Sequence, residues 1–213
     1  MNGRYDAPDA IWIPSACRAY AGGMTVETLR FEILTSPPSV SGCLRYVSED
    51  LAFNFRMDVG EQERFGKGST TSFVVDTLQL EVAVDSSLCL YIWGYCPMGR
   101  WEQSLLSPPI GQPGSLRASH DKPLVHGVAI GLEQMMPATA WFDPDSGWFC
   151  IGNKNSAGGV ESVEFATGCL AVIVGGRLSS LWIKPENWKD MAESFLKQKR
   201  SASDTEISPP ASS

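Results

Sequence analysis

Six cysteines and two histidines are the residues best able to supply nucleophiles, metal ligands or acid–base groups. The cysteines are Cys17, Cys43, Cys89, Cys96, Cys150 and Cys169, and no two of them form a CxxC pair. Because a structural zinc site needs closely spaced Cys or His ligands, we expect no metal. Several of the cysteines lie in apolar runs, where a free thiol behaves as a small buried hydrophobe. We therefore expect reduced thiols and a cytoplasmic protein.

Cys96 is the best candidate nucleophile, because Pro97 follows it and a thiol at a turn could be exposed. A reactive thiol needs a nearby cation that lowers its pKa, and Arg100 is the cation within local reach. His120 stands beside Asp121 in a flexible segment, whereas His126 is expected to begin an apolar strand. A general base needs a positioned partner, and sequence neighbours on a loop do not supply one. We therefore assign no catalytic residue.

Two further segments resemble ligand-binding loops without matching them. In GEQERFGKGS, residues 60–69, five residues separate the first two glycines where a phosphate-binding loop has four, and a glycine follows Lys67 where Ser or Thr is required. In DPDSG, residues 143–147, Asp143 and Asp145 lack the further oxygen ligands of a calcium loop. The second segment instead predicts a tight turn, in which Asp side chains bond the backbone and Gly147 is left-handed. We expect no cofactor.

The stretch LCLYIWGYCPMGRW, residues 88–101, concentrates aromatic side chains near a turn. Its first eight residues favour a strand, and Gly94 and Pro97 indicate where the strand ends. Trp, Tyr and Arg are the side chains that dominate protein interfaces. We therefore expect one or two residues to be exposed among Trp93, Tyr95, Arg100, Trp101, Trp141 and Trp148. The candidate partner-binding residues are Trp93, Tyr95, Arg100, Trp101, Trp141, Asp143, Asp145 and Trp148.

Most of the elements that must position these residues are predicted to be strands. Three stretches alternate apolar and polar residues with a period of two: residues 29–33, 53–59 and 78–84. This pattern is typical of antiparallel strands with one face on a core. Turn-forming residues interrupt the chain at 36–42, 60–69 and 107–123. Further strands are expected at 124–132, 140–142, 148–151 and 160–166.

A glycine hairpin and a helix end the expected domain. Gly175 and Gly176 predict a two-residue turn that pairs Ile173 with Leu178 and Ala171 with Ser180. The helix is expected to start near Pro185 and to pack on the sheet through an apolar stripe made of Trp188, Met191, Ala192, Phe195 and Leu196. The predicted class is α+β, a predominantly antiparallel β-sheet with one C-terminal amphipathic helix. We expect one compact domain over residues 1–200, with a seam near 107–123, and a disordered tail over 201–213.

Charge and hydropathy limit the classes of partner. The chain of 213 residues carries 24 acidic and 17 basic side chains, a net charge of −7. Nucleic-acid binding needs a gathered basic surface, so we expect no nucleic acid and favour a basic protein partner. The sequence has no apolar run long enough to span a bilayer and no recognisable secretion signal, so we expect no membrane association.

Two segments suggest a family. IWGYCPMGRW and, about sixty residues later, VEFATGCLAVIVGGRLSSLWIKPENW resemble small cytosolic immunity proteins encoded beside bacterial polymorphic toxins. The shared pattern is a strand, a glycine hairpin that contains Gly175 to Leu178, and a tryptophan strand that ends at Pro185. The resemblance implies a non-catalytic protein that binds a cognate toxin and blocks its active site. It identifies no contact residue, because such residues vary widely among these proteins.

Two other classes of function remain open on the sequence. The segment 107–123 could cover a pocket that contains His126, Cys96 or Asp143, which would suit an enzyme or a small-ligand-binding protein. The chain could also be a structural or assembly component, such as a part of a phage or of a secretion machine.

Overall fold

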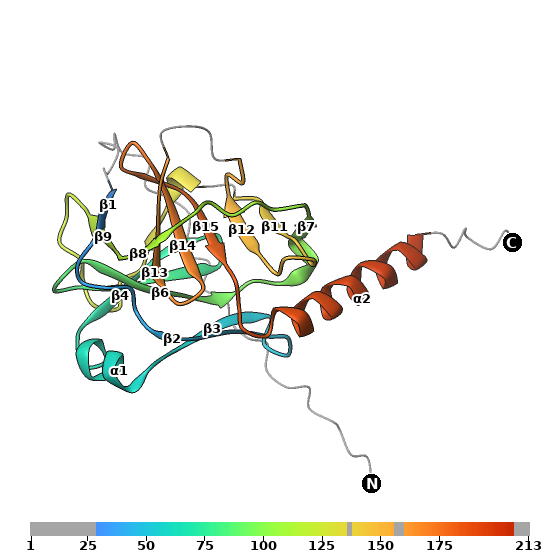
Figure 1. The fold of residues 1–213 in the computed structure, drawn as a ribbon, viewed down its shortest axis with the longest axis horizontal. Helices are drawn as coiled ribbons and strands as arrows, with labels where there is room; N and C mark the ends of the chain where they lie inside the picture. Colours follow the sequence, from blue (N-terminus) through green and yellow to red (C-terminus); the bar gives the residue numbers. More distant parts are fainter. Residues whose placement is uncertain (1–28, 136–137, 156–159, 207–213) are drawn as a thin grey trace, which may run out of the picture.

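The computed structural model describes residues 29–135, 138–155 and 160–206, which form two β-sheets and two α-helices besides short 3-10 turns. The first sheet, sheet A, contains β1 (Arg30–Leu34), β2 (Gly42–Val47), β3 (Ala52–Met57), β4 (Thr70–Val75), β5 (Leu78–Ala83), β6 (Leu88–Tyr95), β9 (Ser115–Ser119) and β10 (Ile130–Gly131). The second, sheet B, contains β7 (Trp101–Gln103), β8 (Gln112–Pro113), β11 (Ala140–Phe142), β12 (Phe149–Gly152), β13 (Glu161–Ala166), β14 (Cys169–Val174) and β15 (Arg177–Ile183). Figure 1 shows both sheets. The α+β class with mainly antiparallel pairing is confirmed.

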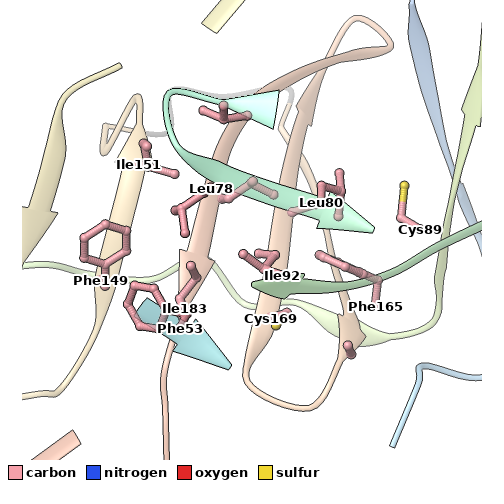
Figure 2. Packing of buried hydrophobic residues seen from close by; sticks show 14 of the residues in the cluster. Phe53, Leu78, Leu80, Cys89, Ile92, Phe149, Ile151, Phe165, Cys169 and Ile183 are labelled. Carbon is pink, nitrogen blue, oxygen red and sulfur yellow. The ribbon is translucent and has the colours of Figure 1, made fainter. Parts of the chain in front are cut away.

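The core lies between the two sheets. Figure 2 shows apolar side chains from both of them, among them Phe53 and Ile92 from sheet A and Phe149 and Ile183 from sheet B, converging on one space. The predicted alternation is confirmed: Phe31, Phe53 and Leu80, for example, are buried. Burial of such side chains is the main favourable term in folding, at about 25 cal/mol per Å² of apolar surface.

The segment 107–123 crosses from one sheet to the other. Within it, β8 pairs with β13 of sheet B, and β9 lies between β1 and β6 of sheet A. The connecting Gly114 donates its backbone N–H to the carbonyl of Glu164, 3.1 Å away. The middle of this segment is therefore part of the sheets and does not form the lid that we considered.

Trp101 lies in the middle of the core, with 1% of its surface exposed. A 3-10 turn, η1 (Met98–Arg100), follows β6 and directs the chain inward to β7. The indole centroid is 5.1 Å from Tyr46, 5.0 Å from Phe149 and 6.0 Å from Phe195. The expectation that Trp101 belongs to a partner-binding surface is therefore wrong for this fold, because the whole ring is packed inside.

The C-terminal helix α2 (Trp188–Glu206) buries apolar side chains in its first two turns. Met191, Ala192 and Phe195 are buried, whereas Trp188 and Leu196 are half-buried. Figure 1 shows the rest of the helix projecting away from the sheets. The helix continues through residues 201–206, where we expected the start of a disordered tail, and residues 207–213 lie outside the described residues.

The helix begins later than predicted because the residues before it bind an edge strand. Pro185 precedes a turn, and the side chain of Asn187 bonds to β2. Its amide oxygen accepts from the N–H of Tyr46 at 2.9 Å, and its amide nitrogen donates to the carbonyl of the same residue at 2.8 Å. This side chain satisfies backbone groups that an edge strand leaves open. In the described part of the chain, no helix is both long enough and apolar enough to cross a membrane.

Several local predictions differ from the structure. Residues 59–65 form a short helix, α1 (Val59–Phe65), where we expected a loop, and Val59 is consequently 74% exposed instead of facing the core. Of the strand expected over 124–132, only β10 is present. The residues before β10 are instead bonded to β4, since the N–H of Gly127 donates to the carbonyl of Thr70 at 3.0 Å. Residues 42–47 and 70–75, which we did not predict, are strands.

The glycine hairpin is confirmed, with one change of register. Gly175 and Gly176 have φ angles of 57° and 75°, the left-handed values that the tight turn requires. Ile173 pairs with Leu178 as predicted, but Ser180 pairs with Val172 instead of Ala171. A bulge that adds one residue to β15 causes this shift, and period-two patterns do not reveal such insertions.

Candidate protein-binding surface

The outer face of β6 presents aromatic side chains. Ile92 points into the core, whereas Tyr91, Trp93 and Tyr95 point outward, and Trp93 and Tyr95 are 38% and 48% exposed. Gly94 lies between the two exposed rings with a φ of +115°, and a Cβ there would be 3.0 Å from the carbonyl oxygen of Thr77. The close approach of the β4–β5 turn therefore requires glycine. We expected one or two of six residues to be exposed, and three of them are: Trp93, Tyr95 and Arg100.

A buried carboxylate supports the Trp93 ring. The indole Nε1 donates to Oε2 of Glu81 at 3.0 Å, and the hydroxyl of Ser72 donates to the same oxygen at 2.8 Å. Glu81 is 8% exposed, although it stands on the outward face of β5. Because the acceptor is charged and shielded from water, these bonds are stronger than ordinary neutral ones. They hold the indole in one orientation.

Tyr91 is the least accessible ring of this row. Its ring stacks on Phe55 with 5.0 Å between centroids and an interplanar angle of 5°. Burial, and secondarily the carboxylate of Glu81, raises the pKa of the Tyr91 phenol. The phenol is therefore neutral at physiological pH and adds a polar group without charge to the surface.

An exposed ion pair lies beyond Tyr95. Nη1 of Arg100 is 3.5 Å from Oδ2 of Asp76, and the two side chains are 63% and 38% exposed. Thr77, next to Asp76, donates its hydroxyl to the carbonyl of Tyr95, so this turn lies against the end of β6. An exposed pair contributes little to stability, which leaves both charges available to a partner. We call this set of residues the β6 surface: Asp76, Glu81, Tyr91, Trp93, Tyr95 and Arg100.

Trp141 and Trp148 lie on the outer face of sheet B instead, and both are half-buried. They pack against a second cluster of buried side chains on that face: Leu106, Cys150, Leu170, Val172 and Trp182. The Lys154 ammonium lies 3.5 Å from the centroid of the Trp141 ring, and the Lys184 ammonium lies 5.6 Å from that of Trp148. The structure therefore separates these two tryptophans from Trp93 and Tyr95.

Asp143 supports a turn from a buried position. Its Oδ1 accepts from the N–H of Asp145 at 3.0 Å, and its Oδ2 accepts from the N–H of Leu106 at 3.0 Å. Burial alone would raise the pKa of Asp143, but these hydrogen bonds and those from Ser146 outweigh it and lower the pKa. The predicted DPDSG turn is confirmed, with Gly147 at φ +77°. Asp145 is exposed at the tip, whereas Asp143 is 4% exposed and stabilises the fold.

The thiols are held in environments that keep them protonated. Cys96 is 5% exposed, its Sγ lies 3.3 Å from the indole Nε1 of Trp101, and burial raises its pKa to about 12. Burial likewise raises the pKa of Cys89, and those of Cys150 and Cys169 to about 12. A thiol with so high a pKa is a poor nucleophile. The half-buried Cys43 donates to Oε2 of Glu186 at 3.0 Å, and that hydrogen bond is the main cause of its raised pKa. Cys17 lies outside the described residues.

A hollow of about 780 Å³ lies beside the end of the 107–123 segment. Its walls include Glu32, Arg117, His120 and Lys122, and the Arg117 guanidinium pairs with Glu32 at 2.7 Å. His126, Cys96 and Asp143, the residues considered for a pocket, do not line it. In the described ranges, no three His, Cys, Asp or Glu side chains are close enough together to hold a metal.

No protein-family model matches the sequence, and no curated protein matches it.

The sequence did not predict that Glu81 and Ser72 support the Trp93 ring. Glu81 and Ser72 are polar residues on outward strand positions, which normally indicates solvent exposure. They become buried because the Trp93 ring from the next strand covers the carboxylate. Cross-strand register brings Ser72, Glu81 and Tyr91 side by side, and single-sequence patterns do not reveal register.

Proposed function

We propose that this chain is a non-catalytic binding protein of the immunity type, which binds and neutralises a cognate toxin through its β6 surface. The observation that carries the proposal is the pair of exposed rings, Trp93 and Tyr95, beside the exposed Arg100–Asp76 ion pair. Aromatic and arginine side chains grouped in this way are the usual energetic centres of protein interfaces.

Two further features support a binding role. Trp93 is held by Glu81 before any partner arrives, so less side-chain entropy is lost on association. The net charge of −7 suits a basic partner such as a nuclease domain, because complementary charge accelerates encounter. The resemblance to immunity proteins described above agrees with this role.

The test is co-expression with the toxin encoded by the neighbouring gene. The wild-type chain should restore growth and be recovered in complex with the toxin. The double variant Trp93→Ser/Tyr95→Ser should fail to protect and should bind at least about 30-fold more weakly, the effect expected for a hot spot. Val174→Ser is the matched control, because Val174 is 47% exposed on the opposite sheet. A toxin that stays fully active beside the wild-type chain would reject the proposal.

A second candidate function is small-ligand binding in the hollow. Its walls combine the charges of Glu32 and Arg117 with polar groups, and its size is within the range of small-molecule sites. A thermal-shift screen of polar metabolites tests it, with Arg117→Ala as the variant that should abolish any stabilisation. If the ligand still stabilises the protein after Arg117→Ala and after replacement of His120, the ligand binds outside the hollow.

A further inference from the structure

Several tryptophans of this protein are in contact with one of its own lysines. Lys154 lies over Trp141 at 3.5 Å, and Lys184 lies 5.6 Å from Trp148 and 5.8 Å from Trp188. An aromatic ring attracts cations through the negative charge density of its faces, and tryptophan does so most strongly. On sheet B, therefore, lysines of the chain itself already occupy the faces of Trp141 and Trp148.

Trp93 is the exception among the partly exposed tryptophans that the structure describes. Among residues 29–135, 138–155 and 160–206, no lysine or arginine lies over its ring. The other two tryptophans of those ranges, Trp101 and Trp182, are buried in apolar clusters and have no room for a cation. Trp93 thus has an accessible ring with no internal cation.

The surroundings of Trp93 favour a positive group. Its N–H points at the charged Glu81, which polarises the indole and places a negative charge beside it. The β2–β3 turn, which contains Glu49 and Asp50, lies beside Tyr95, because the N–H of Cys96 donates to the carbonyl of Leu51 at 2.7 Å. Arg100, the cation of the β6 surface, lies beyond Tyr95, where it pairs with Asp76.

We infer that the Trp93 indole is a preformed platform for an arginine or lysine side chain of the protein partner, with Glu81 as the residue that positions it. This inference rests on the proposed function and specifies the chemistry of its contact. The Glu81 carboxylate beside the ring disfavours a nucleic acid, since a base stacked on Trp93 would bring its phosphates towards a negative charge.

Glu81 has two separable effects. Its carboxylate accepts the indole N–H, which fixes the ring, and its charge attracts the bound cation. Glu81→Gln keeps a carbonyl oxygen for the indole and removes the charge, whereas Glu81→Ala removes both. Ser72→Ala removes the second donor to the same carboxylate oxygen, so it should loosen the support without changing the charge.

The experiment uses ¹⁹F NMR of the full chain labelled with 5-fluorotryptophan, with Trp93→Phe to assign the resonance of Trp93. The probe is the blocked peptide acetyl-Gly-Arg-Gly-amide, and the control is the same peptide with uncharged citrulline in place of arginine. The arginine peptide should shift the Trp93 resonance saturably and leave that of Trp141, whose ring Lys154 already covers, unchanged. Equal shifts from the two peptides, or a larger shift of Trp141, would overturn the inference.

The Glu81 variants test the positioning role. Without peptide, Glu81→Ala should move and broaden the Trp93 resonance, and Glu81→Gln should restore a sharp line. With peptide, Glu81→Gln should weaken binding about two- to fivefold, the range expected for an exposed cation–π contact that loses its neighbouring charge. An unchanged Trp93 line in Glu81→Ala would show that Glu81 does not position the ring.

Failure of the inference can be distinguished from failure of the proposed function. If Trp93→Ser/Tyr95→Ser abolishes protection but the arginine and citrulline peptides act alike, the surface binds its partner by other chemistry and the inference is wrong. If the arginine peptide binds as expected but the double variant still protects against the toxin, the cation platform stands and the proposed use of the surface is wrong.

Discussion

Tryptophan side chains are covered on the outer face of sheet B but partly exposed on the outer face of sheet A. On sheet B, Trp182 is fully buried, and Trp141 and Trp148 are half-covered by the chain's own segments and lysines. On sheet A, Trp93 stands over a buried carboxylate with more than a third of its surface exposed. A strand position decides only which side of the sheet a ring is on, and the elements that cross that side decide whether the ring stabilises the fold or stays available.

A few specific contacts bury the tryptophan side chains on the outer face of sheet B. The segment after β7 places Leu106 over the outer face, and Asp143 fixes it there through the N–H of Leu106. The result is a second small core outside the main one. In sheet A the corresponding interaction around Trp93 is polar, from Glu81 and Ser72, and orients the ring without enclosing it.

Among the variants that test this difference between the sheets, Trp182→Ala should change the free energy of unfolding most. The side chain is fully buried, so removing it should leave a cavity and lower the free energy of unfolding by about 3–5 kcal/mol. Urea unfolding followed by circular dichroism measures the change. Trp93→Phe is the control from the other face and should cost about 1.5–3 kcal/mol, mainly for the lost bond to the buried Glu81 carboxylate. If the two variants lose the same unfolding free energy, the outer faces of sheets A and B do not differ in how much their tryptophans stabilise the fold.

Asp143→Ala should have an intermediate effect, about 1–3 kcal/mol, because it leaves the buried N–H of Leu106 without its acceptor. The pKa of Asp143 is lower in the folded protein than in the unfolded chain. Its stabilisation should therefore be complete above the unfolded pKa of about 3.9 and be lost as the pH falls through the folded value.

Denaturant unfolding of the wild type and of Asp143→Asn at a series of pH values checks this dependence. The difference in unfolding free energy between them should shrink on acidification below about pH 4. Asp145→Asn, an exposed change in the same turn, is the matched control and should show a smaller difference at every pH. A constant difference across the series would mean that the Asp143 carboxylate charge contributes nothing.

Lys154→Met should have the smallest effect. It keeps the apolar stem over Trp141 and removes the ammonium that lies 3.5 Å from the ring centroid and donates to Ser104 at 2.8 Å. The expected loss is about 0.5–1 kcal/mol, and Lys154→Arg should recover most of it. Because Lys154→Met leaves no cation over Trp141, the arginine peptide should shift the Trp141 resonance more than it does in the wild type. If the peptide still leaves the Trp141 resonance unchanged, the Lys154 ammonium is not the reason why Trp141 and Trp93 differ in peptide binding.

Much of the strand framework was predictable from local patterns. The alternation around Phe31, Phe53 and Leu80 predicted both the strands and their inward faces, and two adjacent glycines predicted the hairpin at Gly175. Helix α1 was missed because a glycine-rich stretch favours a loop in isolation. Asp58 precedes that helix, and the Gln62 side chain donates to the carbonyl of Met57 at 2.8 Å, a contact that holds its first turn.

The candidate site was predictable only in part. An aromatic strand running into a turn identified Trp93 and Tyr95, but it also placed Trp101 in the same group, and the structure buries that ring. The chain changes direction at η1 within a few residues, so neighbours in sequence end on opposite sides of a sheet. The partners of Trp93, Glu81 and Ser72, come from two other strands that no local pattern connects to it.

Local side-chain chemistry was enough to specify many of the strands, the glycine hairpin and the DPDSG turn, and which side of those strands is apolar, because these features depend on residues a few positions apart. The pairing of strands across the two sheets, the bulge in β15, the burial of Trp101 and the carboxylate beneath Trp93 depend on contacts between residues far apart in the chain. Those contacts are set only when the sheets pack together, since packing determines which outward faces another segment covers and which remain open.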